Sequence, residues 1–315
     1  MAHFPKLTNE DFKTYPKTEW KEEWKGSPWE EIFNRPLADV SQEQLDALNN
    51  GPCNPQLAMP IENRSDLFLP GEQSVEIGYC AMPDGTGFVA NRTFFPNATP
   101  EMLDWWMNFH PLSGERLAAW LPNAHLDCYV REPYLHCDES GFSLATRNWG
   151  KEHMASEGLT SLEESGLCRL KFYSPQDVGL DMIKIALSPV KAHAFLSVVF
   201  FGDGLVMFGE EQAKEILAKD PNAQIPFNCL LHTFRPVPGG CELRSRFWIG
   251  KGIKNGVPYT TLPKGMDAEA ISWVMLRHTI QEMSNLASFL PEMYNKYEGK
   301  ILLKDIVAPQ PENAI

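Results

Sequence analysis

The sequence lacks the segments that would place it in a membrane or on a secretory route. Its longest apolar run covers residues 194–201, far fewer than the ~20 apolar residues that a spanning helix needs. Residues 1–24 are polar and charged and contain no apolar core of a signal peptide. The seven cysteines are odd in number and include no CxxC pair, which predicts free thiols in a reducing compartment. We therefore expect a soluble, cytoplasmic protein without a membrane partner.

Basic charge is also scarce. The chain carries 28 Lys and Arg against 41 Asp and Glu, a formal net charge of −13, with a pI near 5.1. Nucleic-acid binding needs a basic surface that displaces counterions from phosphates, so that class of partner is excluded. Hydrophobic residues make up 43% of the 315 residues, which is enough for a real core in one large domain or two modest ones.

Short motifs of the common enzyme classes are missing as well. The sequence contains no HExxH zinc motif, no Walker A loop and no GxGxxG dinucleotide loop. No cysteine stands out by its neighbours as a nucleophile. Metal-assisted hydrolysis is the enzyme class that remains.

The chain changes character near residue 72. Residues 1–72 are rich in Pro and Trp and predict a small N-terminal domain that is mostly helical or irregular. Its clustered tryptophans are Trp20, Trp24 and Trp29. Such side chains pack either on the main domain or on a second subunit, and we expect a homodimer with residues 1–70 in its interface. Residues 73–315 would form the catalytic domain.

The second part alternates strand-like stretches with turns rich in Gly, Pro and Asp. The predicted strands are Ser74–Ala81, Gly87–Phe94, His125–Arg131, Leu167–Tyr173, Phe195–Phe201, Leu205–Phe208, Asn228–Arg235 and Cys241–Ile249. Helices are predicted over Thr99–Phe109, Glu115–Trp120 and Glu210–Lys219. No strand–helix–strand alternation occurs, so the sheet should be antiparallel.

The clearest helix runs from Asp267 to about Phe289 and is predicted to end at Pro291. Its apolar residues form one stripe, which indicates that this face is buried. The stripe consists of Ile271, Val274, Met275, Leu286 and Phe289. A curved antiparallel sheet that grips this C-terminal helix, an α+β fold, is the expected architecture.

Two polar residues, His278 and Glu282, lie within that stripe. Because they are four residues apart, they share one face of the helix. A carboxylate among apolar side chains is costly unless it is paired or binds a metal. The pair can be a structural His–Glu hydrogen bond, in the core or at the edge of the stripe, or half of a metal site. The motif is short and frequent, so alone it does not decide between them.

The other histidines are weaker candidates. His125 and His232 each lie in a strand-like run, where a structural role is the commoner one. His110 follows a predicted helix, and a charged histidine there would favour the helix dipole. His153 and His193 lie in segments that we expect to be exposed.

The most specific signal is a set of three blocks along the chain. They are NFHPLSGERLAAWLPNAH (108–125), HTFRPVPGGCELRSRFWIGKG (232–252) and WVMLRHTIQEMSNLASFLPEMY (273–294). Together they resemble the family of phloretin hydrolases and 2,4-diacetylphloroglucinol hydrolases, over most of the chain from about residue 75 to 295. The resemblance implies zinc-dependent cleavage of the bond between an acyl group and a phloroglucinol ring. It also implies a Bet v 1-like helix-grip domain preceded by a small dimerisation domain.

The resemblance further implies a zinc ion held by two histidines and two glutamates. Carried over residue by residue, the ligands are His125, Glu157, His278 and Glu282. The position of the first glutamate is the least secure, because other glutamates lie close to it in the sequence. These neighbours are Glu152, Glu163 and Glu164. His232 matches a family histidine proposed to transfer a proton, so His232 and Glu157 are the candidate catalytic residues.

The substrate implied by the resemblance is a small aromatic ketone. In the diacetylphloroglucinol branch, an Asn lies three residues after the first zinc histidine and a Tyr eight residues before it; here these positions hold Cys128 and Leu117. This departure favours the phloretin branch, whose substrate carries one acyl chain ending in a phenol. A helix-grip carrier of aromatic ligands without catalytic activity is the rival hypothesis, but it has no use for two buried glutamates.

Overall fold

An eight-stranded antiparallel sheet with one long helix across it forms the centre of the computed structural model. The structure describes residues 4–300 except 131–143, 160–161, 163–164 and 263–265. The sheet has the order β1-β2-β8-β7-β6-β5-β4-β3. Its strands are β1 Gly78–Ala81, β2 Gly87–Pro96, β3 His125–Val130, β4 Glu152–Glu157, β5 Gly166–Tyr173, β6 Ala192–Phe201, β7 Gln224–Val237 and β8 Gly240–Ile249. A separate hairpin pairs β9 (Lys251–Lys254) with β10 (Val257–Thr260).

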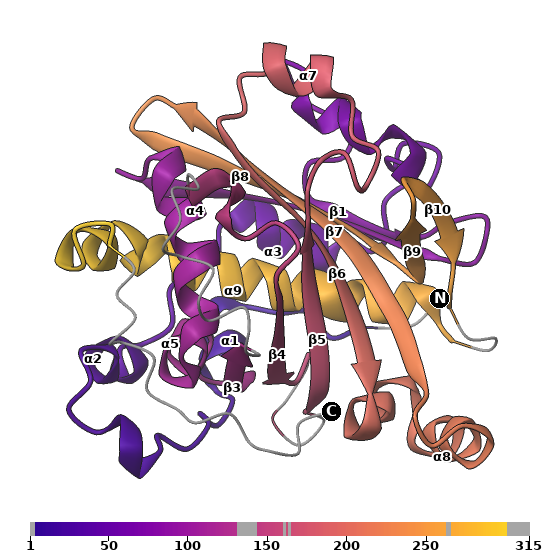
Figure 1. Ribbon diagram of the computed structural model, residues 1–315, viewed down its shortest axis with the longest axis horizontal. Coiled ribbons are helices and arrows are strands. Elements are labelled where there is room, and N and C mark those ends of the chain that lie inside the picture. The colour runs from indigo at the N-terminus through magenta and orange to yellow at the C-terminus, as the bar shows by residue number, and fades with distance from the viewer. Residues whose placement is uncertain (1–3, 131–143, 160–161, 163–164, 263–265, 301–315) are drawn as a thin grey trace.

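The helices are short except for the last one. They are α1 Asn9–Lys13, α2 Trp29–Asn34, α3 Gln42–Asn49, α4 Pro100–Phe109, α5 Gly114–Trp120, α6 Leu144–Arg147, α7 Met182–Leu187, α8 Glu210–Lys219 and α9 Ala268–Lys296. Figure 1 shows α9 lying across the strands, with α4 and α5 near one of its ends. This arrangement confirms the predicted α+β fold, a curved antiparallel sheet around a C-terminal helix. None of the described helices combines the length and apolar character needed to span a lipid bilayer.

Three of the predicted elements differ from the structure. The strand predicted to begin at Ser74 begins at Gly78. The stretch Leu205–Phe208 is not a strand but part of the 3-10 segment η6 (Gly202–Phe208), because the chain turns at two glycines with positive φ, Gly202 and Gly209. Helix α9 does not end at Pro291 but continues to Lys296. The extra turn is held by packing: Met293 is fully buried and the ring of Tyr294 lies 5.5 Å from that of Trp105. Tertiary packing here outweighs the hydrogen bond that the proline removes.

The N-terminal tryptophans pack within the chain. Trp29 is fully buried, and its ring lies 5.7 Å from Trp106 and 6.0 Å from Phe289. Its Nε1 donates a hydrogen bond of 3.1 Å to the Tyr297 hydroxyl. Packing inside one chain therefore accounts for Trp29 without a second subunit. The dimer interface and the division of the chain at residue 72 stay predictions.

The face of the sheet opposite α9 is also covered. Arg244 and Arg246 of β8 are fully buried there and share one carboxylate, with nitrogen–oxygen distances of 2.5 and 2.7 Å to Glu76. Arg64 of the 3-10 segment η2 (Ile61–Phe68) donates hydrogen bonds to the carbonyl oxygen of Val178 at 2.6 and 2.9 Å. These contacts leave the other face of the sheet, toward α9, to form the pocket.

Candidate metal centre

Helix α9 presents His278 and Glu282 on the face that it turns toward α5 and the sheet. The helix is fixed in rotation by two hydrogen bonds with Trp120 of α5. The indole Nε1 donates to the carbonyl oxygen of Glu282 at 2.9 Å, and the Asn285 amide donates to the carbonyl oxygen of Trp120 at 2.7 Å. His278 is 6% exposed and the Glu282 side chain 13% exposed, so both are removed from bulk water.

Strands β3 and β4 bring His125 and Glu157 together. The two residues are direct partners in the antiparallel ladder, next to a register shift between His125 and Asp127. The Nδ1 of His125 lies 3.1 Å from the carbonyl oxygen of Leu117, which can only accept, so Nδ1 carries the proton. The other nitrogen, Nε2, is therefore the one with a free lone pair. It lies 3.5 Å from Glu157 Oε2 and 3.8 Å from Glu282 Oε1.

Three of the four predicted ligands form a compact group. Ligand atoms of His125, Glu157 and His278 all lie within 4.8 Å of one another. Glu282 is outside that group but within 3.8 Å of His125. Of the alternative glutamates, Glu152 lies at the other end of β4 and pairs with a lysine, Lys171, at 3.1 Å. Residues 163 and 164 are outside the described part of the chain.

The charges of this group are not balanced by the protein. No Lys or Arg among the described residues forms an ion pair with Glu157 or Glu282. Burial, and then the neighbouring charge of Glu157, raises the pKa of Glu282 well above its usual range. Burial raises the pKa of Glu157 as well. Burial, followed by the charge of Arg277, lowers the pKa of His278 to about 4. Glu157 and Glu282 therefore have no basic side chain beside them among the described residues, and the imidazole of His278 stays neutral.

A divalent metal ion fits these residues. His125 Nε2 and His278 Nδ1 are buried atoms with no hydrogen-bond partner, an arrangement that is costly unless a lone pair binds something. Two neutral imidazoles and two carboxylates are a donor set suited to zinc, and their two negative charges would match its charge. Supporting contacts are in place, because the Cys168 thiol donates to Glu157 Oε1 at 3.4 Å and the Leu117 carbonyl orients His125.

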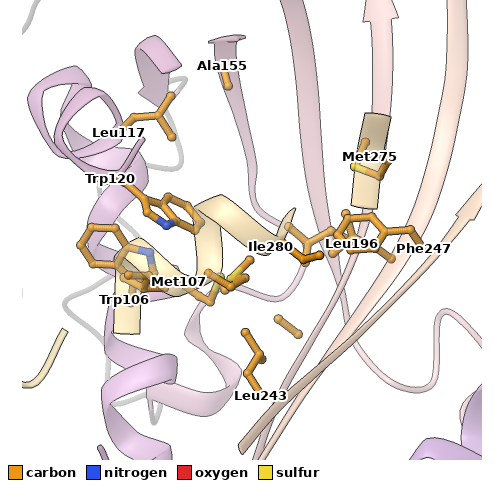
Figure 2. Packing of buried hydrophobic residues seen from close by; sticks show 14 of the residues in the cluster. Trp106, Met107, Leu117, Trp120, Ala155, Leu196, Leu243, Phe247, Met275 and Ile280 are labelled. Atoms are coloured by element: carbon orange, nitrogen blue, oxygen red, sulfur yellow. The ribbon is translucent and has the colours of Figure 1, made fainter. Parts of the chain in front are cut away.

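The group lies in the wall of a pocket between the sheet and α9. Its walls are mainly apolar, as Figure 2 shows for Met107, Leu117 and Trp120 on one side and Leu196 and Phe247 on the other. Glu157, His278 and Glu282 line the same pocket. An apolar cavity with a few converging polar groups is typical of a small-molecule site.

His232 lies in the wall of this pocket, as part of β7. Its Nδ1 is 2.8 Å from the hydroxyl oxygen of Ser245 on the neighbouring strand β8. Burial lowers the pKa of His232 to about 4, so the ring is neutral near pH 7. A neutral imidazole held by one nitrogen can take up or release a proton at the other.

Two further pocket residues, His110 and His153, were not predicted from the sequence. His110 is 3% exposed and its Nδ1 lies 2.8 Å from the carbonyl oxygen of Trp106; burial lowers its pKa well below the usual value. It is therefore a neutral residue and not the charged helix terminus that we expected. His153 is 2% exposed, so its predicted exposure is wrong. Its charged neighbour Glu152 suggested a surface segment, whereas strand alternation turns His153 inward.

Metal removal provides a direct test of the group. We expect zinc to raise the melting temperature of chelator-treated protein by several degrees. A ligand that binds only the folded state stabilises it by about 4 kcal/mol at a thousandfold excess over its Kd. Magnesium, which prefers six oxygen ligands, should give little shift and serves as the control ion. Equal melting temperatures with and without zinc, measured by scanning calorimetry, would contradict a zinc site here.

Comparison with known proteins finds one matching family and two types of similar hydrolase. Residues 58–295 match the family model of the DAPG hydrolase PhiG domain. The chain is 29% identical over 257 residues to a 2,4-diacetylphloroglucinol hydrolase from Pseudomonas sp, which covers 76% of this chain and 78% of that protein. It is 27% identical over 279 residues to a phloretin hydrolase from Eubacterium ramulus, which covers 87% of this chain and 91% of that protein. Among solved structures, major latex-like protein 151 from Panax ginseng is 10% identical, with a TM-score of 0.35 over 64% of this chain and 96% of its own.

Proposed function

The chain belongs to the family of DAPG hydrolase PhiG domains, and from this premise we propose that it is a zinc-dependent hydrolase of acylphloroglucinols. It would cleave the carbon–carbon bond between the acyl group and the ring. The observation that carries the proposal is the group of His125, Glu157 and His278, with Glu282 beside it, at the wall of an apolar pocket. A carrier of aromatic ligands would need the pocket but not two buried carboxylates without a cation.

The proposed reaction adds the elements of water across the bond between the carbonyl carbon and the ring. Hydroxyl goes to the carbonyl carbon and yields a carboxylic acid, while the proton goes to the ring carbon and yields phloroglucinol. A bound zinc ion would supply Lewis acidity toward the carbonyl and acidify water. His125, Glu157, His278 and Glu282 would hold it, and their two negative charges keep its net charge low. We infer that general acid–base catalysis by the protein must then contribute substantially to the rate.

His232 is the residue proposed to provide this general acid–base catalysis. The leaving group is a ring carbanion, which must be protonated as the bond breaks. Since His232 is neutral and Ser245 holds its Nδ1, its Nε2 would take the proton of the attacking water and pass it to the ring carbon. Burial of the ring keeps bulk water from competing for this proton.

Phloretin is the proposed substrate, with phloroglucinol and 3-(4-hydroxyphenyl)propanoate as products. Leu117, buried in the pocket wall, supports this choice because it offers no hydrogen bond to a second acetyl group. Cys128 gives no such support, because its thiol lies 3.5 Å from the carbonyl oxygens of His110 and Ser113 and it does not line the pocket. Diacetylphloroglucinol is the alternative substrate, since both types of relative are about equally similar to this chain.

We expect phloretin to be cleaved with a kcat/KM higher than that for 2,4-diacetylphloroglucinol. A second acetyl oxygen that is desolvated against Leu117 without a partner costs roughly 1–3 kcal/mol, a factor of about 5 to 150 in rate. Incubation with phloretin, monoacetylphloroglucinol and diacetylphloroglucinol, with products resolved by chromatography, measures the order. Comparable kcat/KM values for phloretin and diacetylphloroglucinol would contradict phloretin as the preferred substrate, but not the proposed reaction.

A homodimer and a cytoplasmic location are also proposed. Six cysteines within the described part of the chain are free, which suits a reducing compartment. Light scattering at micromolar concentration tests the dimer. We expect twice the chain mass of 35.6 kDa, and a single chain mass would rule the dimer out.

A further inference from the structure

His110 and His153 form a second polar site in the pocket, apart from the metal centre and from His232. His110 belongs to the 3-10 turn η3 (His110–Leu112) after α4, and His153 is the second residue of β4. Their rings meet edge to face, with centroids 5.5 Å apart and an angle of 87°. Both are almost fully buried, and both line the pocket. The proposed reaction uses neither of them.

The hydrogen bonds available to this pair are specific. His110 Nδ1 donates to the Trp106 carbonyl, so its Nε2 can only accept. Neither ring nitrogen of His153 has a hydrogen bond among the described residues, so one can donate and the other accept. Both rings are held neutral by burial, which lowers the pKa of His153 to about 3. A neutral group that both donates and accepts, such as a hydroxyl, is therefore matched, and a carboxylate is not.

Two observations place the pair relative to the metal centre. The ring of Trp120 lies between the pair and the metal centre, with its centroid 5.0 Å from that of His110 and 5.4 Å from that of His125. Along β4, His153, Ala155 and Glu157 face the pocket in turn, so His153 is about 13 Å from Glu157 along the backbone. Ala155 between them contributes only a methyl group, which leaves the floor of the pocket open. An elongated ligand can then have one end at the metal centre and the other at the polar site of His110 and His153.

We propose that His110 and His153 bind the phenol hydroxyl at the far end of the substrate's acyl chain. The hydroxyl donates to His110 Nε2 and accepts from the N–H of His153, while the carbonyl group lies at the metal centre. An acetyl group is too short to reach the pair and leaves its nitrogens without a partner. The pair thus selects an arylpropanoyl chain with a terminal hydroxyl. This inference rests on the proposed function, because it deepens the choice of substrate for the same site.

The test uses three substrates that differ only at the end of the acyl chain. They are phloretin, its analogue with hydrogen in place of the chain's phenol hydroxyl, and its analogue with a methoxy group there. For the zinc-loaded full-length protein, kcat/KM and calorimetric affinity are measured for each. We expect both analogues to be poorer by about 5- to 150-fold, because each leaves a buried nitrogen unpaired. The loss should appear mainly in KM, since the contact is remote from the reacting carbonyl.

The variant His153→Phe keeps a ring of similar size beside Phe172, whose centroid is 5.8 Å away. It should lower kcat/KM for phloretin toward that of the hydrogen analogue, because one of the two hydrogen bonds to the hydroxyl is lost, and lower kcat/KM for the hydrogen analogue much less. His193→Phe is the matched control, because His193 is a half-buried histidine that contacts Phe68 outside the pocket. It should leave the preference for phloretin intact.

The outcomes separate this inference from the proposed function. Equal values for phloretin and the hydrogen analogue in the unmodified protein would overturn the inference, as would an equal loss for both substrates in His153→Phe. If no compound is cleaved but calorimetry shows that phloretin binds more tightly than the hydrogen analogue, and His153→Phe narrows the difference, the proposed reaction fails and the hydroxyl site stands. If neither cleavage nor discrimination is seen, both fail.

Discussion

Replacement of His278 by alanine is expected to leave the protein without bound zinc and without measurable hydrolysis of phloretin. The side chain is one of three whose ligand atoms lie within 4.8 Å of one another, and its Nδ1 has no other partner. Changes in the outer shell of a metal site typically cost 10- to 100-fold in affinity or activity, so the loss of a direct ligand should exceed that range. Elemental analysis and a rate measurement on the same preparation report the two effects.

The variant His193→Ala is the control for this experiment. It removes another imidazole, which is half-buried, has no partner for its Nε2 and lies outside the pocket. It should keep one zinc per chain and near-normal activity. If His278→Ala also keeps one zinc per chain, the proposed ligand set is incorrect, whatever the activity.

Replacement of His232 by alanine should have the second-largest effect, and of a different kind. We expect the rate to fall by about 10²- to 10⁴-fold, the usual cost of losing general acid–base catalysis, while the zinc content stays near one per chain. The buried ring has a pKa lowered to about 4 and is neutral above that value. Activity that depends on neutral His232 should therefore decline only as the pH falls toward 4, rather than near 6.5 as for an exposed histidine.

Ser245→Ala gives a graded comparison for that residue. It removes the hydroxyl 2.8 Å from His232 Nδ1 but keeps the imidazole, so its loss of rate should be smaller than that of His232→Ala. Near-normal activity of His232→Ala would place the proton transfer elsewhere, on a substrate hydroxyl or a tyrosine. Loss of zinc from His232→Ala would instead show that this residue supports the metal.

The central part of the fold could be predicted because each element has a clear pattern. Helix α9 has an apolar stripe that contains His278 and Glu282, and the strands follow one another without intervening long helices. Antiparallel pairing and a gripped helix follow from these patterns. The pair on α9 was also visible, because four residues make one turn. Its meeting with His125 came from the resemblance and not from the physics of the sequence.

Strand β4, which carries Glu157 and His153, was missed from the residue pattern. Its sequence EHMASE places a histidine and a glutamate on the inward face, where most strands have apolar residues. The strand is stable because the pocket receives these polar groups and because β3 and β5 pair on both sides of it. A strand that lines a polar site therefore escapes a search based on apolar alternation. His110 escaped for a related reason, since a histidine before a proline is typical of an exposed helix end.

The edge-to-face contacts of Trp120 with His110 and His125 have a consequence for optical measurements. Its indole contacts one imidazole of the metal centre and one of the hydroxyl site, and its own N–H is fixed on the Glu282 carbonyl. Emission from an indole changes when a neighbouring imidazole gains positive charge or a metal. The difference between the fluorescence of the unmodified protein and that of Trp120→Phe would therefore follow metal binding at the His125 end of the pocket in real time, with no added dye.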